Sequence, residues 1–217
     1  MRIEFYAELA KKRIILRQIV PFRASEFIAM TNCDSFCNQV RMSAQCIVES
    51  GAAGLSGLYD LTAQRLVRFA VTITRNQHDA EDAVQASLVR VVASPQVLTR
   101  ADSPWPYLLR IVRNESLVIL RKKRRWAVVQ SLTDLLTSRS VDELEQEESF
   151  RAVWLAMRSL PVEQREVIVL KIWEDLTFAQ ISDVLGVPAA TAASRYRYGL
   201  QKLSAQLQSF DVEVVHE

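Results

Sequence analysis

The chain has 217 residues with 27 basic and 25 acidic side chains, but only 5 glycines and 6 prolines. So few turn-forming residues among abundant Ala, Leu and Val predict an all-α protein of one or two small domains. The three cysteines make an odd number with no partners elsewhere in the chain, which argues against a disulfide framework. A structural zinc site would need a fourth ligand, and the two histidines, His78 and His216, are remote in sequence. No apolar run is long enough to span a bilayer, so we expect a soluble, cytoplasmic protein that does not insert into membranes and needs no cofactor.

Residues 1–50 mix charged and apolar side chains without sustained periodicity. They predict a poorly defined extension that precedes the first domain. Met30 and Met42 are both plausible alternative starts, so the segment is either a true extension or upstream of the real start.

Two amphipathic helices are expected next. Apolar residues recur at helical spacing from Leu55 to Ile73, and Asn76 ends that helix. A second helix spans Asp79 to Ala93, and its early acids complement the positive end of the helix dipole. Its buried stripe leaves three polar side chains on the opposite face: Asp82, Gln85 and Arg90. The acids beside His78 form a poor metal cage, because neighbouring side chains on a helix diverge.

A proline-containing stretch, 93–106, leads into a helix expected from Tyr107 to Trp126. This helix has an apolar side, a basic edge and the run RKKRR, with Trp105 just before it. Basic groups follow phosphates and aromatic rings stack on unpaired bases, so the pattern fits single-stranded nucleic acid. The alternative is that the aromatic rings belong to the core.

Residues 127–150 contain six acidic groups and one basic group, which is typical of a linker between two helical domains. The second domain, 151–208, contains a helix-turn-helix pattern. Thr177 and Gln180 form a capping box, Gly186 ends the first helix, and Pro188 begins the second. Small residues and then basic ones follow, as a helix in the DNA major groove requires. A plain helical hairpin with a solvated basic face is the alternative.

From 51 to 207 the chain resembles the sigma-70 family of RNA polymerase sigma factors, in its extracytoplasmic-function (ECF) class. Four motifs carry the resemblance: DAEDAVQ at 79–85, YLLRIVRN at 107–114 followed by RKKRR, LPVEQREVIVL at 160–170, and GVPAATAASRYR at 186–197. There are also departures. Ala86, Ser87 and Leu88 stand where the family usually has Glu-Thr-Phe, and Tyr107 replaces a Trp. Ala193 stands where many members are basic, so promoter preference cannot be carried over.

The resemblance implies that 51–126 is sigma region 2, which binds core polymerase and the −10 element, and that 151–208 is region 4, which binds the −35 element. It leaves 209–217 as a tail. The residues implied for binding the polymerase β′ clamp helices are Asp82, Gln85 and Arg90. Those implied for the melted −10 strand are Trp105, Tyr107, Arg113, Asn114, Arg121, Lys122, Arg124 and Arg125. Those implied for the −35 duplex are Thr191, Ala193, Ser194, Arg195, Arg197, Tyr198 and Lys202.

The implied partners are core RNA polymerase, through its β′ clamp helices and β flap, promoter DNA and an anti-sigma factor. The acidic linker, 134–148, resembles a nucleic-acid mimic that could enter a basic polymerase channel. Two other functions stay open. A stand-alone helix-turn-helix regulator would explain only 177–202, and a metal-dependent nuclease using the acids near His78 would lack a convergent ligand set.

Overall fold

The computed structural model describes residues 33–130 and 156–214 of the chain, with side chains from 35–125 and 156–206. Within these ranges all regular structure is helical, so the all-α prediction is confirmed. The N-terminal half (33–130) contains α3 (Cys33–Ser50), a 3-10 turn η1 (Gly51–Gly54), α4 (Leu55–Thr74), α5 (Gln77–Ala93), α6 (Gln96–Thr99) and α7 (Pro104–Gln130). The C-terminal half (156–214) contains α9 (Val162–Ile172), α10 (Phe178–Leu185) and α11 (Ala189–Val214).

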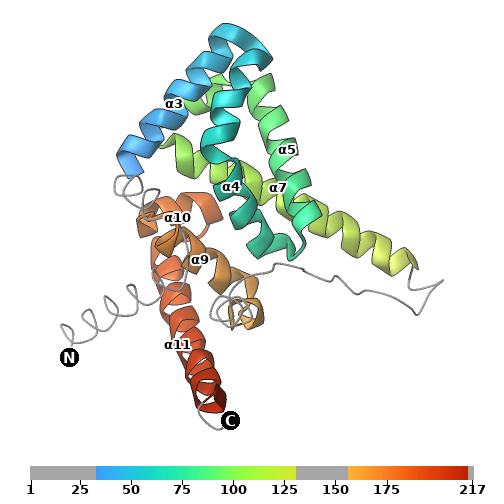
Figure 1. Ribbon diagram of the computed structural model, residues 1–217, viewed down its shortest axis with the longest axis vertical. Helices are drawn as coiled ribbons and strands as arrows, with labels where there is room; N and C mark the ends of the chain where they lie inside the picture. Colours follow the sequence, from blue (N-terminus) through green and yellow to red (C-terminus); the bar gives the residue numbers. More distant parts are fainter. Residues whose placement is uncertain (1–32, 131–155, 215–217) are drawn as a thin grey trace.

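Helices α4, α5 and α7 pack on one another and form the core of the N-terminal half (Figure 1). Their apolar stripes supply fully buried side chains, among them Leu66 and Phe69 of α4, Val91 of α5 and Leu108 of α7. The break between α4 and α5 lies where the sequence predicts it. Arg75 adopts a left-handed conformation at the end of α4, with φ of 59°. The side chain of Asn76 then caps α5 by accepting a hydrogen bond from the backbone N–H of Asp79 at 3.0 Å.

Helix α3 corrects the expectation that residues up to 50 form only a poorly defined extension. Cys37, Val40, Ala44 and Ile47 are buried at alternating spacings of three and four residues, so one narrow face of α3 belongs to the core. The stripe is hard to recognise in the sequence because these side chains are small and polar residues separate them. A chain that began at Met42 would lack two of them. Residues 1–32 lie outside the described part of the chain.

The C-terminal half follows the predicted helix-turn-helix closely. Thr177 and Gln180 form the complete capping box, and Gly186 ends α10 with φ of 67°, a conformation that favours glycine. Both long helices run further than expected. Helix α7 continues to Gln130, and α11 continues to Val214, past the predicted start of a tail at 209. The acidic stretch 134–148 lies outside the described residues.

The two halves pack directly against each other: α9 lies on α4, and α10 lies on α7 (Figure 1). The sequence predicts two helical domains joined by an acidic linker, and the structure adds that the two halves share an interface. No described helix combines the length and the apolar character needed to cross a membrane.

We predict that α3 contributes to stability as a core helix. Ile47 is 1% exposed, so Ile47→Ala should lower the free energy of unfolding by about 2–5 kcal/mol, because it leaves a cavity. Met42 lies on the same helix and is 71% exposed, so Met42→Ala should change it by less than about 0.5 kcal/mol. Urea unfolding of both variants measures the difference, and equal effects would show that α3 does not pack as described.

Candidate nucleic-acid interface

The outer face of α5 carries the first predicted binding surface. Asp82, Gln85 and Arg90 are all exposed, beside Val89, which is one of the most exposed large apolar side chains described. Arg90 pairs with Glu115 of α7 at 2.8 Å, which fixes its position without burying it. These three polar residues and Val89 therefore form an accessible surface along α5.

Asp79, the first acid of the same motif, has a different position. It is buried, and one carboxylate oxygen lies 2.6 Å from Nζ of Lys123 on α7. This ion pair ties the start of α5 to the basic end of α7. No three His, Cys, Asp or Glu side chains converge as metal ligands within the described residues.

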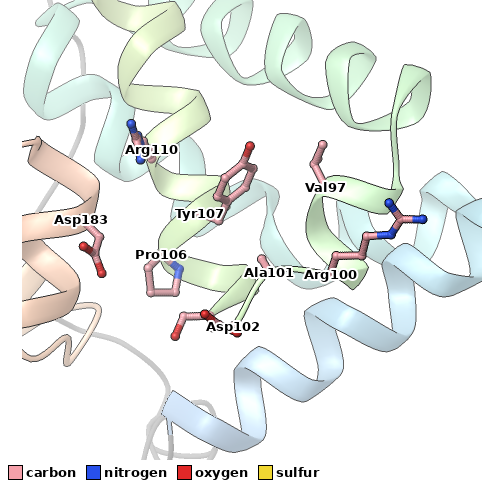
Figure 2. A pocket seen from close by; sticks show the side chains of 9 residues that line it. Val97, Arg100, Ala101, Asp102, Pro106, Tyr107, Arg110 and Asp183 are labelled. Carbon is pink, nitrogen blue, oxygen red and sulfur yellow. The ribbon is translucent and has the colours of Figure 1, made fainter.

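A cavity of about 430 Å³ opens at the start of α7 (Figure 2). The α6–α7 segment contributes Arg100, Tyr107 and Arg110 to its lining, and Tyr107 is 38% exposed. Asp183 of α10 lies across from Arg110 and Pro106, so the C-terminal half closes one side of the cavity (Figure 2). Its remaining lining residues are Val97, Ala101, Asp102 and Ser103. An aromatic ring between two cations suits a nucleotide, because the ring can stack on a base while the cations attract its phosphates.

Trp105 does not belong to this surface, which corrects the prediction that it stacks on unpaired bases. Its side chain is 0% exposed and meets the Phe36 ring edge-on, with a centroid distance of 4.9 Å. The guanidinium of Arg65 lies 3.8 Å from the Phe36 centroid and 4.7 Å from that of Trp105. The ring is thus part of the core, where it joins α3 and α4 to α7.

The basic edge of α7 is largely accessible. Five of the residues predicted to bind the −10 strand are exposed on it: Asn114, Arg121, Lys122, Arg124 and Arg125. Arg113 is the exception: its side chain is 18% exposed, and both Nε and Nη2 donate to the carboxylate of Glu166, at 2.8 and 3.3 Å. The predicted contact of Arg113 with DNA therefore does not fit this arrangement of the two halves, because a carboxylate already occupies its guanidinium.

Helix α11 presents a polar and basic face to solvent. Ser194, Arg197, Tyr198 and Lys202 are exposed, whereas Thr191, Ala193 and Arg195 are half-buried. The guanidinium of Arg197 lies over the Tyr198 ring at 5.0 Å. Behind this face, a Cβ at Gly199 would approach the Ile168 side chain to 2.9 Å, so the glycine allows α11 to pack closely on α9.

Buried ion pairs join the two halves, and local sequence patterns do not predict them. Glu174, in the turn after α9, has a fully buried side chain and binds Arg65 at 2.6 Å and Arg68 at 3.1 Å, both on α4. The Glu166 side chain is 2% exposed and binds Arg113. Nothing local in the sequence marks these pairs, because the partners are 53 to 109 positions apart.

Burial shifts the pKa values of two neighbours in this interface. Desolvation raises the pKa of Glu166, and the charge of Arg113 opposes that rise. Desolvation, followed by the charge of Arg75, lowers the pKa of Arg165 to about 10. Arg165 also donates from Nε to the backbone oxygen of Thr72 on α4, which adds another contact between the halves.

Comparison with known proteins gives two family matches in chain order: Sigma-70 region 2 over residues 58–126, and Sigma-70, region 4 over residues 150–203. The chain is 29% identical over 164 residues to the ECF RNA polymerase sigma factor SigL of Mycobacterium tuberculosis, covering 74% of this chain and 93% of SigL. It is 24% identical over 149 residues to the RNA polymerase sigma factor SigV of Bacillus subtilis, covering 69% of this chain and 88% of SigV.

Two solved structures share the fold. The sigma factor RpoE in complex with the anti-sigma factor NepR from Bartonella quintana matches with a TM-score of 0.59 and 21% identity, over 69% of this chain and 94% of RpoE. CnrH in complex with the cytosolic domain of CnrY matches with a TM-score of 0.54 and 19% identity, over 78% of this chain and 97% of CnrH.

We predict that removing Arg113 leaves a costly buried charge. Arg113→Ala should destabilise the protein by about 3 kcal/mol at neutral pH, because Glu166 then lacks its counter-ion. Arg113→Met combined with Glu166→Leu should recover most of that loss, since neither charge remains buried.

The pH dependence provides the check. A raised folded-state pKa means that stability is present below the unfolded value of 4.5 and is lost as pH rises through the folded value. The loss caused by Arg113→Ala should therefore shrink as pH falls toward 4.5 in urea unfolding. A loss that stays constant with pH would contradict the assignment.

Proposed function

This chain belongs to the ECF group of the sigma-70 family, and we propose that its two helical halves divide the work of transcription initiation between them. The chain is a transcription initiation factor whose partners are core RNA polymerase and promoter DNA. The observation that carries the proposal is the ordered match of region 2 to the N-terminal half and region 4 to the C-terminal half. A stand-alone regulator that binds only duplex DNA would leave the region 2 match without a role.

The outer face of α5 binds the β′ clamp helices of core polymerase under this proposal. Asp82, Gln85 and Arg90 provide polar contacts around Val89, and all four side chains are exposed. Exposed apolar side chains surrounded by polar ones are common in protein interfaces. The C-terminal half provides a second attachment, to the β flap.

The cavity at the start of α7 receives an unpaired base of the −10 element. Tyr107 provides a ring for stacking, worth about 1–3 kcal/mol per base, and Arg100 and Arg110 attract the adjoining phosphates. The exposed basic end of α7 then holds the rest of the strand through its phosphates. Trp105 supports this site from the core instead of contacting a base.

Helix α11 enters the major groove of the −35 element. Its exposed face supports this role, because Ser194, Arg197 and Tyr198 lie together on it. Phosphate contacts position such a helix, and contacts with base edges specify the sequence. The half-buried Arg195 is assigned to a phosphate, and the exposed Arg197 is assigned to the bases.

The protein performs no catalysis in this proposal, since the polymerase makes the phosphodiester bonds. It acts in the cytoplasm, where polymerase and promoter meet. The RpoE and CnrH structures are complexes with NepR and with the cytosolic domain of CnrY, and we infer that a comparable inhibitor holds this sigma factor inactive by covering its polymerase and DNA surfaces.

The proposal is tested by polymerase binding. Asp82→Lys together with Gln85→Ala should weaken co-purification with core RNA polymerase and reduce run-off transcription at least tenfold, without changing helical content. Asp60→Lys with Gln64→Ala places the same two changes about one helical turn apart at exposed positions of α4, and this control should bind as the parent does. If the α5 variant binds core polymerase as tightly as the control, the surface is assigned wrongly.

DNA binding separates the two arginines of α11. Loss of a phosphate contact in Arg195→Ala should weaken binding to all duplexes and lower the slope of log affinity against log salt by about one. Loss of a base contact in Arg197→Ala should cost about 1–3 kcal/mol for the preferred promoter and relax its sequence preference. Holoenzyme binding over a salt series measures both effects, and unchanged affinity in both variants would place α11 outside the groove.

A further inference from the structure

The cavity at the start of α7 depends on a short loop between α6 and α7. Arg100 caps the end of α6, and Ala101, Asp102 and Ser103 connect it to α7. All four residues line the cavity that is proposed to receive a base of the −10 element. The position of this loop therefore decides which polar groups a base meets beside the Tyr107 ring (Figure 2).

The neighbouring helices hold the two ends of this loop. The backbone oxygen of Ser103 accepts a hydrogen bond from the N–H of Tyr107 at 3.2 Å. The N–H of Arg100 donates to the backbone oxygen of Gln96 at 3.1 Å. Ala101 and Asp102 lie between these two ends, and their backbone oxygens are bound from a different helix.

Arg41 of α3 binds both of these oxygens. Its Nη2 donates to the backbone oxygen of Ala101 at 2.9 Å and to that of Asp102 at 3.2 Å. A guanidinium nitrogen carries two N–H groups in a fixed plane, so one side chain can hold two successive carbonyls in a defined orientation. Figure 2 shows α3, in pale blue, passing beside this loop. Arg41 therefore fixes the middle of the loop from outside α6 and α7.

Arg41 has a rigid support. Val40 and Ala44 of the same helix are fully buried in the core, and the Phe36 ring meets that of Trp105 edge-on at 4.9 Å. A group that positions a binding site is effective only when its own backbone is held in place. Helix α3 meets this condition, since core packing holds the helix while the half-buried Arg41 reaches the loop.

We propose that Arg41 is a positioning residue for recognition of the −10 element. It holds the loop 100–103 in place, and through the loop it positions Asp102 and Ser103 in the lining of the cavity. Arg41 itself does not contact DNA. The inference rests on the proposed function for the identity of the ligand. Because Arg41 lies before the segment that matches region 2, it adds a contribution of α3 to promoter recognition.

A loop held in place should increase both affinity and selectivity. A loop that is already ordered loses little backbone freedom when a base binds. A carboxylate or a hydroxyl distinguishes base edges only when its hydrogen-bond geometry is defined. Stacking on the Tyr107 ring tolerates all four bases and does not need the loop. Loss of Arg41 should therefore reduce the selectivity of the cavity more than it reduces stacking.

The first measurement uses the free full-length protein. Arg41→Met removes the donors, and Gln39→Met places the same new side chain at an exposed position of α3 as a control. Trypsin cleaves after Arg100 only when the loop leaves its place, because a protease needs locally unfolded chain. Arg41→Met should be cut there severalfold faster than the parent and the control, with cleavage within 121–125 unchanged. An unchanged rate at Arg100 would overturn the proposal.

The second measurement uses the holoenzyme assembled with core polymerase. A pool of single-stranded oligonucleotides, randomised throughout a central segment, is selected for binding and sequenced. Tyr107→Ala identifies the position whose base enters the cavity, because the preference at that position should disappear with the stacking partner. Arg41→Met should weaken the preference at that same position by about fivefold and leave the other positions as in the parent. Full preference retained there would overturn the proposal.

The two variants separate the role of Arg41 from the proposed function. If Tyr107→Ala alters no position of the pool, the cavity does not receive a base, and both the proposed role of the cavity and that of Arg41 are wrong. If Tyr107→Ala alters one position and Arg41→Met does not, only the role of Arg41 is wrong.

Thermal melting checks that Arg41→Met folds, and co-purification checks that it still binds core polymerase. If it does not fold, Arg41→Gln replaces it, since this side chain stays polar but is too short to span the same distance. A folded Arg41→Gln variant with the cleavage rate and base preference of the parent would overturn the proposal.

Discussion

The arrangement of this molecule depends on a carboxylate that lies inside it between two cations. Glu174 has no exposed side-chain surface, and it receives hydrogen bonds from Arg65 at 2.9 and 2.6 Å and from Arg68 at 3.1 Å. A buried charge is tolerated only when it is paired and hydrogen-bonded. The turn after α9 is therefore held against α4, because moving it away would leave the Glu174 carboxylate without its two partners.

Arg65 extends this constraint into the N-terminal half. Its guanidinium lies over the rings of Phe36 and Trp105 while it donates to Glu174. A single side chain thus connects α3, α4 and α7 with the C-terminal half. Helix α3 precedes the segment that matches region 2, yet through Phe36 it supports the residue on which the contact between the halves depends.

Local signals allowed much of the fold to be predicted from the sequence. The capping box at Thr177, the left-handed Gly186 and the helix of the DAEDAVQ motif each depend on residues close together in the chain. The sequence predicts all three, and the structure confirms them. The ion pairs between the halves depend on residues 53 to 109 positions apart, and helical periodicity does not report such distances. Trp105 was misassigned for a related reason, because a ring beside basic residues looks the same in sequence whether it faces solvent or Phe36.

The distribution of charge between the halves links the fold to the function. In the ion pairs across the interface, the C-terminal half contributes the acids and the N-terminal half contributes the cations. One of these cations, Arg113, is also a residue that the family resemblance implies for the −10 strand. Salt does not affect the contacts with DNA and the buried ion pairs equally. It weakens the exposed phosphate contacts, through counterion release, much more than the buried pairs. Rising ionic strength should therefore weaken DNA binding before it weakens the contact between the halves.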